Sequence, residues 1–253
     1  MKPRPAKQRL DTLLVERGFF ETREKAQRAI MAGNVRVGEK PADKPGLKVA
    51  GDAEVSVRHL SRYVGRGGFK LEAALKAFAL DPTGCVALDV GASTGGFTDC
   101  LLQHGAAKVY AVDVGHSQLA WKIRSDPRVV VHEKVNARFL GRETVPEPVD
   151  LCVIDVSFIS LTLILPPVFE LLKPGGAVVA LIKPQFELGK EEVDKGRGVV
   201  RDPGAQQQAV EKIRTFVSGS LAKSWQGVID SPILGGDGNR EFLALLRGEE
   251  RLA

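Results

Sequence analysis

The stretch Cys85–Thr98, with the sequence CVALDVGASTGGFT, decides the fold of this 253-residue chain. Its apolar first half favours a β-strand, and the residues after the glycine-rich turn favour a helix. Glycines at 91, 95 and 96 let the backbone approach a ligand closely, which a Cβ atom would prevent. The amides at the start of the helix are then free to bind an anion or a carboxylate. The stretch therefore predicts a strand–loop–helix ligand site.

Two acidic residues strengthen this interpretation of the loop. Asp89 ends the predicted strand, where its carboxylate can receive an ammonium group directly or through water. Asp113 ends the next predicted strand, about 20 positions after Gly91, where a carboxylate commonly binds ribose hydroxyls. Nicotinamide and flavin enzymes use a similar turn. The loop alone therefore predicts a nucleotide-like ligand without deciding which one.

Strands and helices alternate around this loop. After an expected helix over residues 69–78, strands are predicted over 86–90, 108–113, 129–131, 151–155, 177–182, 227–230 and 242–246. Helices are predicted over 96–104, 118–123, 161–172 and 203–220. Such alternation predicts an α/β fold with a mainly parallel sheet and helices on both of its faces.

The beginning of the chain has a different pattern. Apolar residues recur at helical spacing as far as Gly18, and Thr22 could cap a second helix that ends at Gly33. Alternating valines then predict short strands, and the segment 58–68 is polar and rich in glycine. We therefore expect a small α+β domain over 1–60, a linker over 61–68 and the α/β domain over 69–253.

Basic residues crowd into the first domain and the linker. Seven of them are candidates for contacting nucleic-acid phosphates: Arg9, Arg17, Arg23, Lys25, Arg28, Arg62 and Arg66. The net charge of the whole chain is only +5, so the clustering of basic residues is better evidence for a nucleic-acid partner than the net charge itself. A basic front on a nearly neutral body is typical of a nucleic-acid-binding module, although a solvated surface would look the same.

Composition narrows the remaining classes. Three cysteines without metal-ligand spacing favour neither a structural metal nor a disulfide framework, and they fit a reducing cytoplasm. No metal site is expected. The basic start leads into no apolar signal segment, and no run of about 18 apolar residues occurs. The sequence therefore predicts a soluble, cytoplasmic protein without a membrane partner.

The loop over residues 89–98 resembles the S-adenosylmethionine loop of the FtsJ-like methyltransferases, and more narrowly of their TlyA-type, hemolysin-like branch. The segments 9–18, 22–26 and 30–35 are similar to an S4 RNA-binding domain. The resemblance covers essentially the whole chain. It implies a Rossmann-like methyltransferase fold with a seven-stranded sheet, S-adenosylmethionine as cofactor, and ribosomal RNA or ribosomal subunits as partner. We expect a monomer or a weak dimer.

The resemblance also implies specific site residues. Those expected to bind the cofactor are Asp89, Gly91, Ser93, Thr94, Gly95, Gly96, Phe97, Asp113, Asn136 and Asp155. A catalytic Lys-Asp-Lys-Glu tetrad falls on Lys70, Asp155, Lys183 and Glu241. Part of this follows from topology, because the carboxyl ends of parallel strands gather Asp155 and Lys183 in one crevice. A buried lysine needs a partner, which Asp155 and Glu241 could supply.

The implied reaction is methylation of a ribose 2′-hydroxyl, with cytidine expected from the family. A lysine acts as a general base only when its pKa falls from about 10.4 toward roughly 7–8. Our hypothesis is that Lys183 deprotonates or orients the hydroxyl, that Lys70 helps to lower the pKa of Lys183, and that the two acids hold the ammonium groups. Asn136 is expected at the adenine edge.

Three alternatives stay open at this point: a membrane-active hemolysin, a non-catalytic RNA-binding or ribosome-assembly factor, and a base methyltransferase. The four-residue tetrad speaks against a non-catalytic factor. The sequence DVSF over 155–158 stands where a base methyltransferase usually carries Asn/Asp-Pro-Pro-Tyr/Phe. Three aromatic residues near these motifs, Trp121, Phe158 and Phe186, are expected to be buried rather than to line the substrate cleft.

Overall fold

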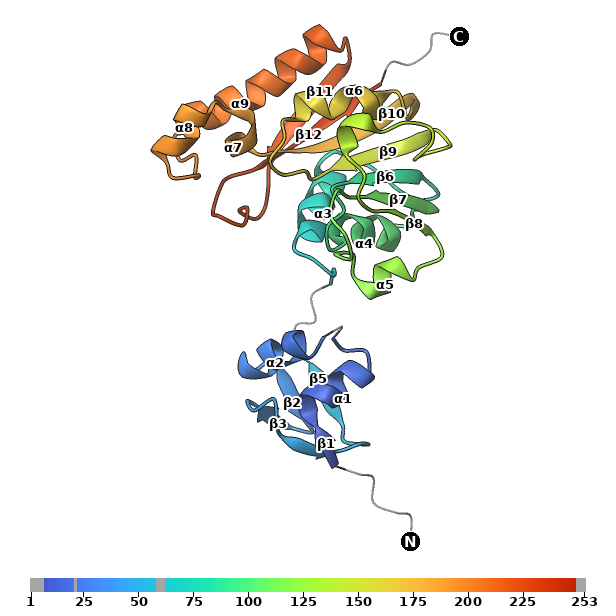
Figure 1. Cartoon of the computed structure of the whole chain (residues 1–253), viewed down its shortest axis with the longest axis vertical. Helices are drawn as coiled ribbons and strands as arrows, with labels where there is room; N and C mark the ends of the chain where they lie inside the picture. The colour runs from blue at the N-terminus through green and yellow to red at the C-terminus, as the bar shows by residue number, and fades with distance from the viewer. Residues whose placement is uncertain (1–6, 21, 58–61, 249–253) are drawn as a thin grey trace. The chain divides into compact units, whose positions relative to one another are not determined.

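The computed structural model of the chain describes residues 7–20, 22–57 and 62–248 and divides the chain into two compact units, Met1–Arg62 and Tyr63–Ala253 (Figure 1). Of the segment 61–68, which was expected as a linker, Ser61 lies outside the described residues and Tyr63 is the first residue of the second unit. Tyr63 is buried in the core of the second unit, edge-on to Phe69 with 5.2 Å between the ring centroids. Burial of this aromatic side chain makes the segment from Tyr63 onward part of the second unit.

The first unit is a small α+β domain. Its helices are α1 (Leu10–Glu16) and α2 (Arg23–Met31), and its strands are β1 (Lys7–Arg9), β2 (Val35–Val37), β3 (Lys40–Ala42), β4 (Lys48–Ala50) and β5 (Val55–Val57). β1 pairs with β4, and β2 lies between β3 and β5, all antiparallel. The Thr22 hydroxyl accepts a hydrogen bond from the Lys25 amide at 3.3 Å, which is the predicted helix cap.

The second unit is built on a seven-stranded sheet in the order β11-β12-β10-β9-β6-β7-β8. These strands are β6 (Val86–Val90), β7 (Lys108–Val112), β8 (Val129–His132), β9 (Val149–Ile154), β10 (Leu172–Ile182), β11 (Ser224–Asp230) and β12 (Phe242–Arg247). In this sheet β12 has the reversed direction, so its pairings with β10 and β11 are antiparallel and the remaining pairings are parallel. The predicted seven-stranded, mainly parallel sheet is confirmed.

Helices connect these strands, and several of them differ from the sequence prediction. The helices are α3 (Gly67–Ala77), α4 (Gly96–Gln103), α5 (Trp121–Arg124), α6 (Leu165–Phe169), α7 (Pro184–Glu187), α8 (Lys190–Lys195) and α9 (Pro203–Thr215). The helix expected over 118–123 begins only at Trp121, because the preceding residue Ala120 has an extended backbone with a ψ of 139°. The helix expected over 161–172 is interrupted before Pro166 and Pro167, which cannot donate backbone hydrogen bonds.

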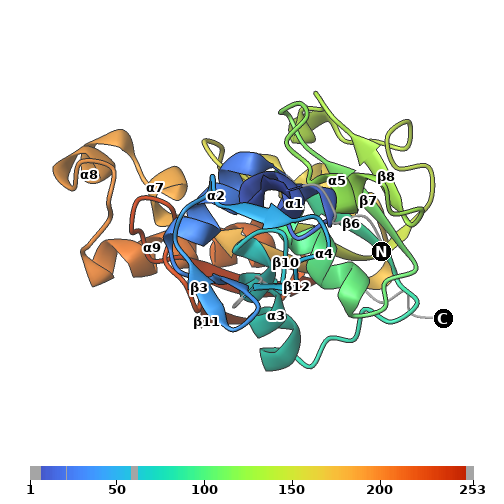
Figure 2. The same ribbon diagram turned by 90° about the horizontal axis from the view of Figure 1, so that it is seen from below.

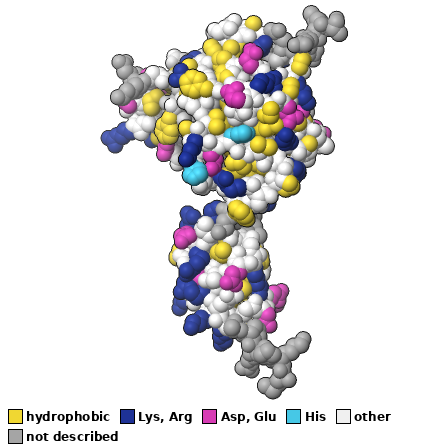
Figure 3. Space-filling model, turned by 45° about the vertical axis from the view of Figure 1, so that its right-hand side comes forward, with side chains coloured by type: hydrophobic (Ala, Val, Ile, Leu, Met, Phe, Trp, Pro, Cys, Tyr) yellow, Lys and Arg dark blue, Asp and Glu magenta, His cyan; other side chains and the backbone are white. Residues whose placement is uncertain are grey.

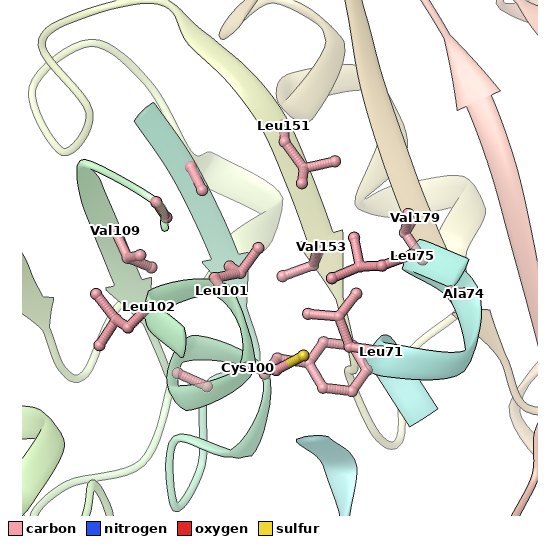
Figure 4. Close-up of a cluster of buried hydrophobic side chains, with 14 of the residues drawn as sticks. Leu71, Ala74, Leu75, Cys100, Leu101, Leu102, Val109, Leu151, Val153 and Val179 are labelled. Atoms are coloured by element: carbon pink, nitrogen blue, oxygen red, sulfur yellow. The ribbon is translucent and has the colours of Figure 1, made fainter. Parts of the chain in front are cut away.

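Two hydrophobic layers cover the sheet. On one face, Leu71 and Leu75 of α3 and Leu101 of α4 pack against Val109 and Val153 (Figure 4). On the other face, α6 and α9 cover alternate residues of the same strands. The alternation turns the side chains of adjacent residues in β6 to opposite faces, so Asp89 faces α4.

The helices that follow β10 gather at one edge of this unit. Figures 1 and 2 both show α7, α8 and α9 together, away from β7, β8 and α5. Because β6, β7, β9 and β10 are parallel, their carboxyl ends lie at the same edge of the sheet, which is where open α/β sheets bind ligands. Among the helices of the described ranges, none is long and apolar enough to cross a membrane.

Candidate active site

The loop between β6 and α4 forms a cradle that requires glycine. Gly91 and Gly95 have φ angles of 87° and 93°, in the left-handed region that other residues rarely adopt. A Cβ atom on Gly91 would lie 2.3 Å from the carbonyl oxygen of Asp155, and one on Gly95 would lie 2.9 Å from a Leu119 methyl group. The loop is therefore fixed in shape by its neighbours, and its backbone is exposed to a ligand.

A cavity of about 440 Å³ lies against this loop. It is lined by residues from four strand ends, among them Gly91, Ser93, Asp113, Asn136, Asp155 and Phe158. The Asp113 carboxylate accepts hydrogen bonds from the amides of Ser93 at 2.7 Å and Gly115 at 2.6 Å. Because each carboxylate oxygen accepts more than one hydrogen bond, Asp113 retains capacity for a ligand hydroxyl. The Asn136 side-chain oxygen accepts from the Arg138 amide at 3.1 Å.

A second cavity, of about 210 Å³, adjoins the first. Its lining includes Arg66, Lys70, Thr94, Gly96, Phe97, Asp155 and Leu234. Gly91, Ser93 and Asp155 line both cavities. Asp155 therefore stands where the contents of the two cavities would meet.

The four predicted tetrad residues form two ion pairs. The Lys183 ammonium lies 2.6 Å from the Asp155 carboxylate and donates to the Ser157 hydroxyl at 2.9 Å. The Lys70 ammonium lies 2.5 Å from the Glu241 carboxylate. Lys70 lines the second cavity, whereas Lys183 lines neither cavity and reaches both through Asp155. Both lysines are buried and both have a carboxylate partner.

Asp89 is fully buried in the middle of the sheet, where it lies opposite Ala111 of β7 and Val153 of β9. One carboxylate oxygen accepts a hydrogen bond from the Thr98 hydroxyl at 2.6 Å, and the other has no partner among the described residues. Burial raises the pKa of Asp89 to about 7, against the opposing hydrogen bond from Thr98. Asp89 lines neither cavity, so it lies beneath the loop rather than at its surface.

Several residues of the site were not predicted. Ser157 contacts Lys183, and the loop 233–236 carries Leu234 over the second cavity. Its glycine pair at 235 and 236 was a usable signal, because a Cβ on Gly235 would lie 2.5 Å from the Glu241 carboxylate. The predicted burial of Phe158 is wrong: it is 90% exposed, has a left-handed φ of 64°, and lines the first cavity.

Of the other two aromatic residues that were expected to be buried, Trp121 is exposed and Phe186 is half-buried. Trp121 is also exposed, contrary to its predicted burial, because it begins the short helix α5 at the surface. The ring of Phe186 is half-buried, with its centroid 5.0 Å from that of Phe158. The exposed Phe158 ring therefore rests on Phe186 at the edge of the first cavity.

The predicted RNA-binding residues occupy different environments. Arg66 lines the second cavity beside Lys70, and Arg62 precedes it on the surface. Arg17 donates to the backbone carbonyls of Gly51 at 2.6 Å and Ala53 at 2.7 Å, so it holds a turn of the first unit. The others in the first unit lie on or beside α1 and α2: Arg9, Arg23, Lys25 and Arg28. Arg9 and Arg23 share one carboxylate partner.

A sheet in this order, with a glycine cradle and adjoining cavities at its carboxyl ends, is the architecture of a Rossmann-like, nucleotide-binding domain. Sequence comparison makes the class specific: the chain belongs to the FtsJ-like methyltransferase family, which matches residues 63–247. Residues 8–55 match the S4 domain. The predicted family, fold class and cofactor, S-adenosylmethionine, are thereby confirmed.

Relatives match nearly the whole chain. The 16S/23S rRNA (cytidine-2′-O)-methyltransferase TlyA of Mycobacterium tuberculosis is 45% identical over 94% of this chain and 89% of its own length. Hemolysin A of Brachyspira hyodysenteriae is 41% identical over 93% of this chain and 98% of its own. The solved structure of a hemolysin-like protein from Streptococcus thermophilus is similar to this chain, with a TM-score of 0.72 and 44% sequence identity. The match covers 99% of this chain and 92% of that chain.

Replacement of Gly91 by alanine is expected to abolish cofactor binding. The new Cβ would lie 2.3 Å from the Asp155 carbonyl oxygen, and the φ of 87° is unfavourable for alanine, so the loop must move. Calorimetric titration with S-adenosylmethionine measures the loss. Gly219→Ala is the matched control, because no atom of the described residues lies within 4 Å of its added Cβ. Binding by Gly91→Ala at the affinity of the control would contradict the assignment of the cradle.

Proposed function

We propose that the protein transfers a methyl group from S-adenosylmethionine to the ribose 2′-hydroxyl of a cytidine in ribosomal RNA. The observation that carries this proposal is the pair of buried lysine–carboxylate contacts beside two cavities that share Asp155. The name of the Mycobacterium tuberculosis relative supplies the cytidine and the ribosomal RNA. A cytoplasmic location follows from this substrate, because ribosomes reside there.

The residues around the first cavity suit the cofactor. Asp113 would bind the ribose hydroxyls and Asn136 the adenine edge, while the glycine cradle leaves room for the methionine part. The buried Asp89 oxygen that lacks a partner lies beneath the loop and lines neither cavity, so it would reach the ammonium group through water. When bound, S-adenosylmethionine supplies an electrophilic methyl carbon on a sulfonium sulfur. The rest of the reaction depends on the residues of this chain.

Those residues hold and activate the hydroxyl. The Lys183 ammonium has three donors, two of which go to Asp155 and Ser157, so its direction is fixed. We propose that Lys183 orients the 2′-hydroxyl and, once it has lost its own proton, accepts the hydroxyl proton on its neutral amine. Asp155 would then hold the resulting ammonium in place. Lys70, held by Glu241, places a second positive charge at the second cavity. Arg66 at the same cavity would bind an RNA phosphate.

Transfer of labelled methyl from S-adenosylmethionine tests the function. Small and large ribosomal subunits and their naked RNA are incubated with the enzyme, and the modified nucleoside is identified by mass spectrometry. We expect label on the 2′-oxygen of cytidine. Label on a base would contradict the proposed chemistry, and absence of label from every RNA and subunit would leave a binding protein as the better interpretation.

The buried Asp89 predicts a pH dependence of stability. The unfolded carboxyl ionises near pH 4, whereas the folded one keeps its proton up to about pH 7. The unfolded chain therefore binds fewer protons in this window, and the free energy of unfolding falls as the pH rises through it, by about 4 kcal/mol from this group. Urea unfolding across pH 4–8 should show the decline in the wild type and its absence in Asp89→Asn. Superimposable profiles would contradict the prediction.

The same group predicts a proton linked to cofactor binding. An ammonium beside Asp89 favours the ionised carboxylate, so binding below about pH 7 must release the Asp89 proton. Calorimetric titration in two buffers of different ionisation enthalpy measures that release. We expect affinity to rise with pH up to about 7 and then level off, and Asp89→Asn to bind weakly without this rise.

A further inference from the structure

The first unit contains a buried carboxylate beneath two of its arginines. Asp11, the second residue of α1, has no exposed surface. The Arg9 guanidinium donates to it twice, at 3.0 and 2.8 Å, and Arg23 donates once at 3.2 Å. The Gln27 amide and the Thr12 backbone N–H also donate to it, at 2.8 and 2.9 Å, and the Thr12 hydroxyl does so at 3.4 Å. These donors hold the pKa of Asp11 well below its usual range, and the hydrogen bonds from Arg9 have the largest effect. The carboxylate therefore stays charged.

The two arginines nevertheless reach the surface. The side chains of Arg9 and Arg23 remain 47% and 51% exposed, while their shared acceptor is fully buried. The Arg9 guanidinium also lies against Gly46, where an added Cβ would come within 3.2 Å of it. Figure 3 shows Lys and Arg side chains gathered along one side of this unit. Two guanidinium groups are thus held side by side, each with donors left for another acceptor.

This arrangement differs from that of other arginines in the unit. Arg17 and Arg36 give their donors to backbone carbonyls, Arg17 to Gly51 and Ala53 and Arg36 to Glu39. Those contacts stabilise turns. A buried charge is costly unless its partners compensate it, and a neutral side chain could fill the same space more easily. The retention of a full carboxylate under two exposed cations suggests a role outside the fold.

We propose that Asp11 is a positioning residue that aligns Arg9 and Arg23 as a clamp for RNA phosphate, an inference that rests on the proposed function. Two unscreened guanidinium groups would repel each other and sample many rotamers. The buried carboxylate offsets that repulsion and fixes both planes before RNA arrives, so less side-chain freedom is lost on binding. The planar donor fork of arginine suits phosphate, and both forks then act together.

Asp11→Asn separates this inference from simple charge effects, because the two predict opposite signs. Removal of a negative charge beside RNA should tighten binding if only net charge matters. Loss of alignment should instead weaken binding to naked ribosomal RNA roughly tenfold. The slope of log K against the logarithm of the salt concentration should also become shallower by up to about 1.8, the value for two phosphate contacts. Asp43→Asn, which removes an exposed acid from the same unit, is the matched control and should bind at least as well as the wild type.

A second variant covers the case in which Asp11→Asn does not fold. Arg9→Lys/Arg23→Lys keeps the net charge and leaves Asp11 paired but removes both donor forks. We expect weaker RNA binding from it, with circular dichroism and thermal unfolding like those of the wild type. Binding equal to the wild type in this variant, or in a folded Asp11→Asn, would overturn the inference.

Binding and catalysis distinguish this inference from the proposed function. RNA affinity is measured by filter binding without cofactor, and methyl transfer is measured separately at saturating RNA. Asp11→Asn should raise KM for RNA and leave kcat unchanged, whereas a general structural defect would lower both. If the wild type transfers no methyl while the Asp11 effect on binding persists, the proposed function fails and the clamp stands. If methyl transfer is normal and the effect is absent, the clamp alone fails.

Discussion

Lys183→Ala is expected to lower the rate of methyl transfer by about 10²–10⁴-fold, the usual contribution of a positioned acid–base group. The Lys183 ammonium lies 2.6 Å from Asp155, which lines both cavities, and no other lysine of the described residues forms an ion pair with Asp155. Because Lys183 itself lines neither cavity, binding of cofactor and RNA should change little. Single-turnover transfer to ribosomal subunits measures the chemical step, and calorimetry measures cofactor affinity.

Lys173→Ala is the matched control for this variant. Lys173 lies in β10, the strand that ends immediately before Lys183, and it also forms an ion pair with a carboxylate, Asp150, at 2.7 Å. It is exposed and lies at the opposite end of the strand, so its loss should affect neither stability nor rate appreciably. A Lys183→Ala rate within tenfold of this control would show that Lys183 is not the group that activates the hydroxyl.

The local parts of this site could be predicted from the sequence. The run from Val86 to Gly96 specifies strand, loop and helix through neighbouring residues alone, and the observed β6 and α4 begin where predicted. Asp113 and Lys183 were placed correctly at strand ends, because a parallel sheet brings such ends to one edge. Periodicity and glycine position carry this information without any knowledge of distant contacts.

The distant contacts could not be predicted. Lys70 and Glu241 are 171 positions apart, and their pairing depends on the antiparallel placement of β12. The sequence suggested two acids and two lysines but not which acid joins which lysine. Phe158 was misjudged for a related reason: its left-handed backbone turns an apolar side chain outward, and periodicity carries no signal for that. The environment of Asp11 also depends on the fold, because its partners Arg23 and Gln27 are 12 and 16 positions away in the sequence.

Lys70→Met is expected to destabilise the fold by about 3–5 kcal/mol, because it leaves the buried Glu241 carboxylate without its partner. The side chains of the pair are only 10% and 3% exposed. Glu241→Gln should be destabilising for the same reason, since it leaves the Lys70 charge buried. The double variant Lys70→Met/Glu241→Gln removes both charges and should recover most of the loss. Urea unfolding of the four proteins gives the coupling energy between the two residues.

The Lys108–Glu147 pair provides the comparison for this cycle. Its charged atoms are 2.8 Å apart, but its side chains are 38% and 42% exposed, so the corresponding coupling should stay below about 1 kcal/mol. A double variant at Lys70 and Glu241 that stays as unstable as either single variant would mean that packing, not charge, sets the cost.

Methyl transfer by the same double variant answers a separate question. Removing both charges can restore the stability of the fold. It cannot restore the positive charge that Lys70, together with Arg66, places at the second cavity. We therefore expect a stable double variant that binds S-adenosylmethionine and transfers methyl poorly. Normal transfer would show that the buried pair serves the fold alone, and it would leave Lys183 and Asp155 to account for the chemistry. A stable but inactive double variant would instead show that the charge of Lys70 is kept for the reaction, at a site where a neutral pair satisfies the fold.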